Sequence, residues 1–160
     1  MIKFERALET DAKILVEIQK RAFLVDVDIC GEGPPGYDSV DYQIQIMNSH
    51  IYNKIIEGDS IIGGFYILSL GNGLYEIVRL FIDTSYQGKG IGSMALQVIE
   101  KMFKDLKILE LEASDFRKDN HIFYENRGYI KIGEVKYSDD GCSYKYQKIV
   151  KKFNENAEAE

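Results

Sequence analysis

The chain has 160 residues, of which 45% are hydrophobic and 29% are charged, and its formal net charge is −6. This length suits one domain with its own core, and the composition excludes an intrinsically disordered chain. The negative charge argues against nucleic acid and anionic membranes as partners. No apolar run reaches the roughly 18 residues of a membrane-spanning helix, and the charged N-terminus does not resemble a signal peptide. We therefore expect a cytoplasmic protein with no nucleic-acid or membrane partner.

Metal chemistry is not indicated by the sequence. The chain contains two cysteines, Cys30 and Cys142, and two histidines, and these residues do not form a spaced ligand set. No metal site is therefore predicted, and both cysteines are expected to be unpaired thiols, as is usual in a reducing compartment.

The N-terminal part of the chain predicts a strand, two helices and a loop between the helices. Residues 2–7 alternate in polarity as a strand does, and residues 10–25 carry apolar side chains at helical spacing, with Ile14, Leu15, Ile18 and Ala22 on one face. Residues 28–38 contain both prolines and three glycines, a composition typical of a long loop. A second helix is predicted from near Ser39, which can cap its N-terminus.

From residue 52 to residue 82 the pattern changes to strands. Gly58-Asp59 and Asn72-Gly73 are tight-turn signals, so three strands should run antiparallel. A helix over about residues 93–104 follows. The next strand, residues 107–113, should run parallel to strand 74–82, because a helix connects the two.

The C-terminal part predicts a short helix and a strand pair. The helix covers about residues 118–126, with Gly128 as its left-handed terminal residue. Two strands, residues 129–137 and 142–150, turn at residues 139–141. We therefore expect a single α+β domain over residues 1–153 and a polar, disordered tail over residues 154–160.

The most informative segment joins strand 74–82 to the following helix, and it reads Gln87-Gly88-Lys89-Gly90-Ile91-Gly92-Ser93. Glycines at alternate positions leave backbone N–H groups uncovered at the N-terminus of a helix. Such a terminus carries partial positive charge and binds phosphate. The segment therefore predicts a cofactor that carries phosphate.

Two familiar phosphate motifs fit this segment poorly. A Walker-type loop requires Ser or Thr after its lysine, whereas Gly90 follows Lys89. Residues 90–95 fit a dinucleotide fingerprint, with Glu110 or Glu112 on the next strand as the ribose ligand. However, Gly90 lies eight residues beyond Ile82, and hairpins join the preceding strands. A dinucleotide-dependent oxidoreductase therefore remains only a weak alternative.

Read from Gln87, the segment matches the signature [QR]-x-x-G-x-[GA], and the chain resembles the GCN5-related N-acetyltransferase (GNAT) superfamily over nearly its whole length. Residues 115–129 resemble a second element of that superfamily, N-x-x-A-x-x-F-Y-E-x-x-G-[FY]. Two positions depart from it. Arg117 stands where many members have an Asn that contacts the cofactor's pantetheine arm, and Asn120 stands where Ala is usual. An arginine there could reach a phosphate or a substrate carboxylate.

The resemblance implies a GNAT-like fold, in which a mixed, mostly antiparallel sheet of about seven strands is flanked by about four helices. In this fold a parallel strand pair splays apart at the cofactor site. The implied activity is transfer of an acetyl group from acetyl-CoA to a primary amine, directly and within a ternary complex. A small-molecule or peptide amine would be the acceptor, and a homodimer is a common assembly. A catalytically inactive acyl-CoA sensor is the alternative within the same fold.

The same resemblance assigns roles to individual residues. Tyr124 occupies the general-acid position, and Glu76 lies where several members place a general base. Each also has a purely structural reading, as a packed helix tyrosine and as a solvated strand carboxylate. Four other carboxylates could serve as the base or bind a cationic substrate: Asp26, Asp28, Glu32 and Asp38. The implied cofactor contacts are Leu80, Phe81, Ile82, Gln87, Gly88, Lys89, Gly90, Ile91, Gly92, Ser93 and Arg117.

Overall fold

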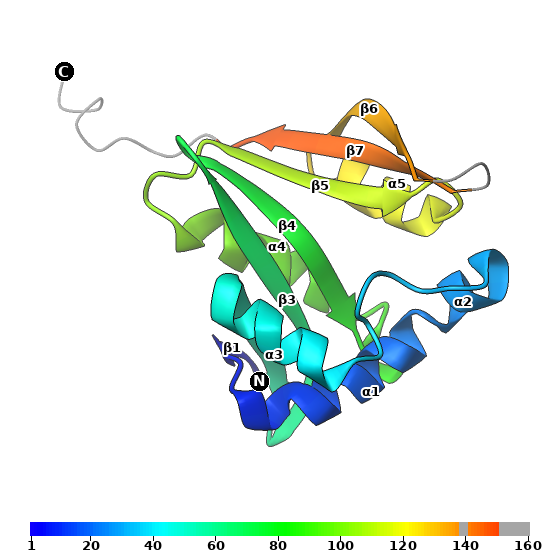
Figure 1. The fold of residues 1–160 in the computed structure, drawn as a ribbon. Coiled ribbons are helices and arrows are strands. Elements are labelled where there is room, and N and C mark those ends of the chain that lie inside the picture. Colours follow the sequence, from blue (N-terminus) through cyan, green and yellow to red (C-terminus); the bar gives the residue numbers. More distant parts are fainter. Residues whose placement is uncertain (138–140, 151–160) are drawn as a thin grey trace, which may run out of the picture.

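A seven-stranded sheet forms the centre of the computed structural model, which describes residues 1–137 and 141–150. Its strand order is β1-β2-β3-β4-β5-β7-β6 (Figure 1). All neighbouring strands are antiparallel except β4 and β5, which are parallel. The strands are β1 (Ile2–Arg6), β2 (Ile51–Glu57), β3 (Ser60–Gly71), β4 (Leu74–Ile82), β5 (Ile108–Ser114), β6 (Ile130–Lys136) and β7 (Cys142–Ile149). The predicted α+β class and mostly antiparallel sheet are thus confirmed.

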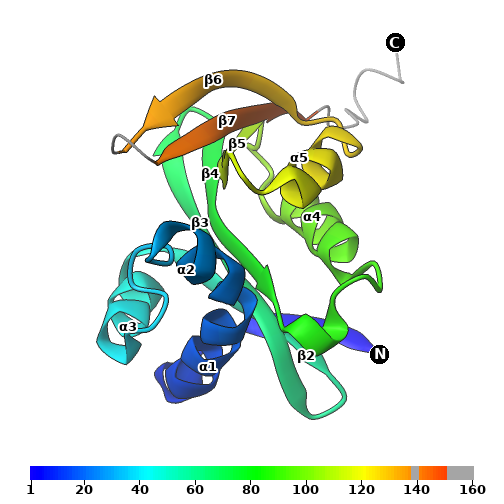
Figure 2. The ribbon, with the colours of Figure 1, turned by 90° about the vertical axis from the view of Figure 1, so that its right-hand side faces the viewer.

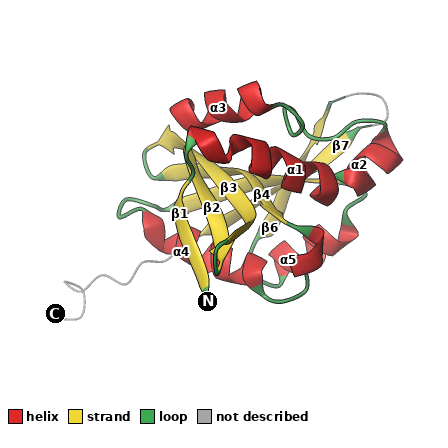
Figure 3. Ribbon diagram, turned by 90° about the horizontal axis from the view of Figure 1, so that it is seen from below, coloured by secondary structure: helices red, strands yellow, loops and turns green. Residues whose placement is uncertain are grey.

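Helices cover both faces of this sheet. On one side lie α1 (Ala12–Ala22), α2 (Leu24–Cys30) and α3 (Val40–Ser49), and on the other lie α4 (Ile91–Met102) and α5 (Lys118–Glu125) (Figures 2 and 3). Two 3₁₀ turns, Glu9–Asp11 and Thr84–Tyr86, complete the described elements. One buried cluster fills the space between α4 and the sheet, and a second lies beneath α1 and α3. The described chain has five α-helices, one more than expected.

The extra helix arises because the first predicted helix is divided. The chain leaves α1 at Phe23 (φ −102°, ψ 13°), and α2 then runs to Gly31, whose φ is +80°. Residues 28–30 therefore belong to α2 and not to the predicted loop. Ile14 was placed on the apolar face, but it is 50% exposed, whereas its neighbour Leu15 is fully buried. That prediction was wrong, because Leu15 and the residues one turn away from it form the inner face.

The predicted turns of the strand region are confirmed. Gly58 has a φ of +59°, and Asn72 and Gly73 have φ values of +55° and +81°, the left-handed pair that a tight hairpin requires. Gly128 ends α5 with a φ of +90°. Residues 138–140 of the last predicted turn and the predicted tail over residues 154–160 lie outside the described residues.

Strands β4 and β5 splay apart after a short parallel contact. Their pairing runs from Leu74 opposite Ile108 only to Ile77 opposite Leu111, although β4 continues to Ile82 and β5 to Ser114. This confirms the predicted splayed pair. A gap of this kind leaves the facing backbone edges of both strands without strand partners beyond the last pair, so the edges are free to bind another extended group.

A one-residue bulge in β4 coincides with the splay. Ile77 pairs with Ile67 on β3, but Arg79 pairs with the adjacent Tyr66, so Val78 is the extra residue. Tyr75 and Ile77 belong to the core cluster beneath α4, whereas Phe81 belongs to the cluster beneath α1. The bulge therefore exchanges the faces to which odd-numbered and even-numbered residues of β4 point.

Candidate active site

The glycine loop lies between β4 and α4. Gly88 and Gly90 adopt φ values of +75° and +81°, and Gly90 is the N-cap of α4, whose first turn receives no hydrogen bond from the N-cap side chain because glycine has none. The helix thus begins at Ile91, two residues before its predicted start. An added Cβ on Gly88 or Gly90 would meet no atom within 4 Å. The backbone donors of this loop are therefore open to an anionic group, which fits the predicted phosphate site.

Side chains of the loop point away from this open backbone. Gln87 Nε2 donates to the Ile82 carbonyl at 2.9 Å and so ties the loop back to the end of β4. Lys89 Nζ lies 5.3 Å from the ring centroid of Tyr86, and Ile91 is buried in the core. These contacts hold the loop in place and leave anion binding to its N–H groups.

Gly92 connects the loop to the second predicted motif. A Cβ on Gly92 would lie 3.0 Å from Cζ of Phe123 on α5, so any larger residue there would push the Phe123 ring by a few tenths of an ångström. Phe123 in turn contacts Tyr124 edge to face, with ring centroids 5.1 Å apart. The glycine loop and the Phe-Tyr pair are therefore parts of one packed unit.

A cavity of about 600 Å³ occupies the splay between β4 and β5. Residues 76–80 of β4, residues 111–114 of β5 and residues 32–35 of the loop before α3 line it. Glu76, Leu80, Arg117 and Tyr124 all line this cavity, so the structure brings these predicted site residues together. Among the alternative carboxylates, Asp26 and Glu32 line it, and Asp28 and Asp38 do not.

The side chain of Phe81 does not belong to this cavity. It is 3% exposed and packs in the cluster beneath α1, and Ile82 packs against the cluster beneath α4. Any contact of Phe81 with a cofactor would therefore use its main chain, as the resemblance implied.

Glu76 is half-buried on β4, directly opposite Glu110 on β5. Burial raises the pKa of Glu76 above its usual 4.5, the charge of Glu112 raises it further, and Lys145 opposes the change. Among the described residues, no ion pair or hydrogen bond involves the Glu76 carboxylate. An unpaired carboxylate with a raised pKa is the property expected of a general base near neutral pH.

The two neighbouring carboxylates are already engaged. Glu110 accepts from Gln147 Nε2 at 3.1 Å and pairs with Lys145 Nζ at 3.2 Å. Glu112 accepts a hydrogen bond from the hydroxyl of Tyr137. Glu76 is thus the carboxylate of this group with a free proton-accepting function, while Glu112 adds negative charge to the same wall.

Tyr124 lies on α5 and is half-buried. Burial raises the pKa of its phenol to about 12, with the positive charge of Arg117 opposing the change. The phenol therefore keeps its proton at physiological pH and can donate it. None of the hydrogen bonds among the described residues uses the Tyr124 hydroxyl, so that proton is available to a bound group.

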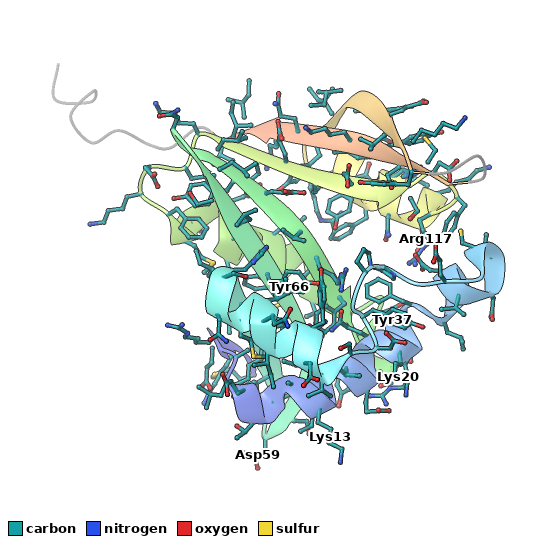
Figure 4. All side chains as sticks on the ribbon, in the orientation of Figure 1. Lys13, Lys20, Tyr37, Asp59, Tyr66 and Arg117 are labelled. Carbon is teal, nitrogen blue, oxygen red and sulfur yellow. The ribbon has the colours of Figure 1, made fainter. Side chains whose placement is uncertain are left out.

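Arg117 is held by carboxylates from two elements. Its Nη1 donates to Asp26 on α2 at 2.7 Å, and its Nε and Nη2 donate to Asp119 at 3.2 Å each. Figure 4 shows Arg117 on the side of the molecule where α2 approaches the start of α5. The pair with Asp26 joins the N-terminal helices to the β5–α5 connection across the cavity. No local sequence pattern relates Asp26 to Arg117, because the two residues lie 91 positions apart.

Arg79 is a cavity residue that the sequence analysis missed. It is 8% exposed, donates to Gln19 Oε1 at 3.1 Å and to the Pro35 carbonyl at 2.8 Å, and has no ion pair among the described residues. Burial lowers its pKa. The sequence pattern that could have indicated Arg79 is an arginine within the apolar run Ile77–Ile82. Burying an arginine is costly unless its donors are used.

The structure thus contains an open glycine loop at a helix start, a splayed strand pair, and a cavity with a free carboxylate and a protonated phenol, the features that the resemblance to acyltransferases implied. The comparison with protein families identifies the group. The family described as "Acetyltransferase (GNAT) family" matches residues 14–129, and the chain belongs to that family. Acetyl-CoA is the standard cofactor of the family, as the resemblance implied, and it carries the phosphate that the glycine loop predicted.

Solved structures share this fold. The ribosomal-protein-S18-alanine N-acetyltransferase from Escherichia coli is 14% identical, with 98% of each chain covered and a TM-score of 0.77. The PaiA N-acetyltransferase from Thermoplasma acidophilum, in complex with coenzyme A, is 16% identical, with 93% of this chain and 99% of that chain covered and a TM-score of 0.76. A chimera of the spermidine N-acetyltransferase SpeG from Vibrio cholerae and hSSAT is 12% identical, with 92% and 95% covered and a TM-score of 0.75.

No curated protein sequence matches the chain significantly. Within residues 1–137 and 141–150, no helix is both long enough and apolar enough to cross a membrane. The antiparallel pairing of β3 with β4, together with the family match, overturns the dinucleotide-binding alternative, because that fold needs parallel strands around its glycine loop.

Proposed function

We propose that this chain is an acetyl-CoA-dependent N-acetyltransferase that transfers an acetyl group directly to a primary amine within a ternary complex. The observation that carries the proposal is the meeting of Glu76 and Tyr124 in one cavity at the splay of β4 and β5. An unpaired carboxylate and a protonated phenol are the base and the acid that this transfer requires. An inactive sensor would have no use for this pair.

The cofactor contacts are proposed from the backbone outward. The N–H groups from Gly88 to Ser93 would hold the pyrophosphate, and the main chain of Leu80, Phe81 and Ile82 would bind the pantetheine arm. Gln87, Lys89 and Ile91 support the loop through their own contacts. Three of the five N–H donors of Arg117 bind Asp26 and Asp119, so two are left with which it would reach an anion.

Acetyl-CoA supplies an activated acetyl thioester when bound. Glu76 accepts a proton from the acceptor's ammonium group, through water, and so generates the neutral amine that can attack. The N–H of Leu80 stabilises negative charge on the carbonyl oxygen. As the C–S bond breaks, Tyr124 gives its Oη proton to the departing sulfur, and the second proton that the nitrogen loses as the amide forms returns to the Tyr124 phenolate. No covalent bond to the protein is required, and neither cysteine takes part.

A small cationic amine is the acceptor that the charges favour. Glu76 and Glu112 line the cavity with negative charge, and the positive charge of Arg117 is balanced by Asp26 and Asp119. Arg79 bonds neutral groups alone and keeps its positive charge, but its donors are directed to Gln19 and to the Pro35 carbonyl. A cavity of about 600 Å³ is within the range that binds small molecules.

The test has two stages. Saturating acetyl-CoA should raise the melting temperature of the protein, and no shift would refute the cofactor assignment. Released thiol should then be measured with a panel of amines: spermidine, 1,4-diaminobutane, L-lysine, phenethylamine and a peptide with N-terminal alanine. Tyr124→Phe should lower kcat by about a hundredfold and keep the acetyl-CoA shift. Tyr129→Phe, which removes another buried hydroxyl, is the control. Cofactor binding without thiol release for any amine would support the sensor alternative.

A further inference from the structure

The segment of residues 32–36, whose residues 32–35 form one wall of the cavity, is held by buried side chains. Arg79 Nη2 on β4 donates to the Pro35 carbonyl at 2.8 Å, and Gln43 Nε2 on α3 donates to the Gly36 carbonyl at 2.9 Å. Two successive carbonyls of an otherwise irregular segment are thus bound from two different elements.

The anchoring side chains are themselves held in a buried network. Gln43 and Gln19 are fully buried, and Tyr52 Oη donates to Gln43 Oε1 at 2.7 Å. Arg79 binds Gln19, and its guanidinium lies 5.2 Å from the ring centroid of Tyr66, which Figure 4 places beneath α3. Each anchor is therefore restricted to one orientation.

The wall itself is tightly packed. A Cβ on Gly33 would lie 2.6 Å from the ring of Tyr37, and a Cβ on Gly36 would lie 2.0 Å from the ring of Tyr42. The two prolines between these glycines fix their own φ angles. The segment thus has little conformational freedom once the two carbonyls are bound.

Burial of Arg79 is energetically unfavourable, so we consider what an arginine provides at this position. Burying a guanidinium with no carboxylate partner is unfavourable, and an apolar residue at this position of β4 would fill the space without that cost. What the arginine adds is a pair of charged donors that reach Gln19 and Pro35 at the same time. Arg79 therefore contributes by holding the Pro35 carbonyl, and with it the wall, in place.

We propose that Arg79 and Gln43 are positioning residues that fix residues 32–36 as a rigid wall of the acceptor cavity and so determine which amines fit. The inference rests on the proposed function, because it assumes that the acceptor binds in this cavity. Neither residue needs to touch the acceptor or the cofactor. Their substitution should change acceptor recognition and leave acetyl-CoA binding unchanged.

The experiment compares Arg79→Lys, Gln43→Met and the double variant with the unmodified protein. The apparent KM should be measured for the panel amine with the highest rate. Each single variant should raise it by about tenfold, equivalent to about 1.4 kcal/mol, with an unchanged melting shift from acetyl-CoA. The double variant should raise the apparent KM by much less than the product of the two single fold-increases, because both side chains act through one segment. Arg21→Lys, which alters an exposed pair with Asp83, is the control.

Hydrogen exchange over residues 31–38 gives a readout that does not depend on turnover. It should become faster in both variants and stay unchanged in the control. Faster exchange with an unaltered acceptor KM would overturn the inference and leave the proposed function intact. Equal losses of acceptor and acetyl-CoA binding would reduce both residues to a general structural role. No acetyl-CoA shift in the unmodified protein would overturn the proposed function, and the inference with it.

Discussion

The glycine loop and the wall of the acceptor cavity use the same residue type for opposite purposes. At Gly88 and Gly90 an added Cβ would meet nothing within 4 Å, so glycine leaves backbone donors uncovered. At Gly33 and Gly36 it would strike tyrosine rings at 2.6 and 2.0 Å, so glycine allows the backbone to be covered. The region proposed to bind the cofactor is therefore built from exposed main chain, and the region proposed to bind the acceptor is built from packed side chains.

This difference predicts which functions separate on mutation. Changes in the loop should affect acetyl-CoA alone, because its donors are backbone groups that no side chain replaces. Changes in the wall or in the carboxylates should affect the amine alone. A variant that weakens acetyl-CoA binding and amine recognition equally would contradict this separation.

The largest effect is expected for Glu76→Gln, which should lower kcat/KM for the amine by about a thousandfold with an unchanged acetyl-CoA shift. Because the pKa of Glu76 is raised, kcat/KM of the unmodified protein should fall as the pH drops through that raised value. The variant should lack this limb of the pH profile. Glu110→Gln is the control, because that carboxylate is paired with Lys145. A pH limb that persists in Glu76→Gln would assign the base elsewhere.

Glu76 should also affect stability in the direction opposite to an ion-paired carboxylate. A folded pKa above the unfolded value of 4.5 means that ionisation favours unfolding, so its cost appears as the pH rises above about 4.5. Glu76→Gln should therefore melt no lower than the unmodified protein at pH 7. That advantage should disappear below pH 4.5, and its persistence there would indicate another cause.

Gly90→Val should weaken acetyl-CoA binding by about a hundredfold, because a β-branched residue at a φ of +81° is strained and would crowd the donors. Isothermal titration measures the affinity. Gly58→Val is matched to it, with a φ of +59° and nothing within 4 Å of its Cβ, but it lies in a distant turn. Equal losses in both variants would show a folding effect and not a local one.

Gly36→Ala should raise the acceptor KM by about tenfold, or about 1.4 kcal/mol, because the new methyl group would displace the ring of Tyr42 and shift the wall. Gly31→Ala carries the same left-handed cost, with a φ of +80°, but nothing lies within 4 Å of its Cβ. The acceptor KM of both variants, measured by steady-state kinetics, separates the effect of backbone strain from that of the contact with the Tyr42 ring. A similar KM in the two would contradict the rigid wall.

The smallest change in turnover is expected for Asp26→Asn. Loss of the charged hydrogen bond to Arg117 should lower the free energy of unfolding by about 1.5–3 kcal/mol, because both side chains are largely buried, while turnover changes only a few-fold. Urea denaturation measures the stability. Glu134→Gln removes an exposed pair with Lys131 and should change the stability much less than Asp26→Asn does. Equal losses of stability in both variants would mean that the Asp26–Arg117 pair contributes no more than an exposed ion pair.

The sequence could predict those parts of the molecule that depend on local backbone chemistry. Asn72-Gly73, the glycine loop and Gly128 all adopt the left-handed conformations that their residue types suggested. The meander, the parallel pair and its splay followed from these turns and from the family resemblance. The meeting of Glu76 and Tyr124 in one cavity followed from the resemblance as well.

The contacts that shape the acceptor side could not be predicted in this way. Arg79 and Pro35 are 44 residues apart, and Asp26 and Arg117 are 91 apart, so no local pattern relates either pair. The break between α1 and α2 at Phe23 also has no proline or glycine to mark it. Such features depend on which side chains meet after folding, and a spacing rule does not contain that information.

The bulge at Val78 has a consequence for how members of this family can diverge. Arg79 and Leu80 are consecutive, yet the first anchors the acceptor wall and the second packs toward the cluster beneath α4. One strand thus serves two ligands through alternate residues, and a point substitution changes the environment of one ligand at a time. A change of acceptor then requires no loss of cofactor binding at any intermediate step. Deletion of Val78 would remove the bulge but leave Ile77 opposite Ile67 and Arg79 opposite Tyr66, so both faces of β4 would keep their residues.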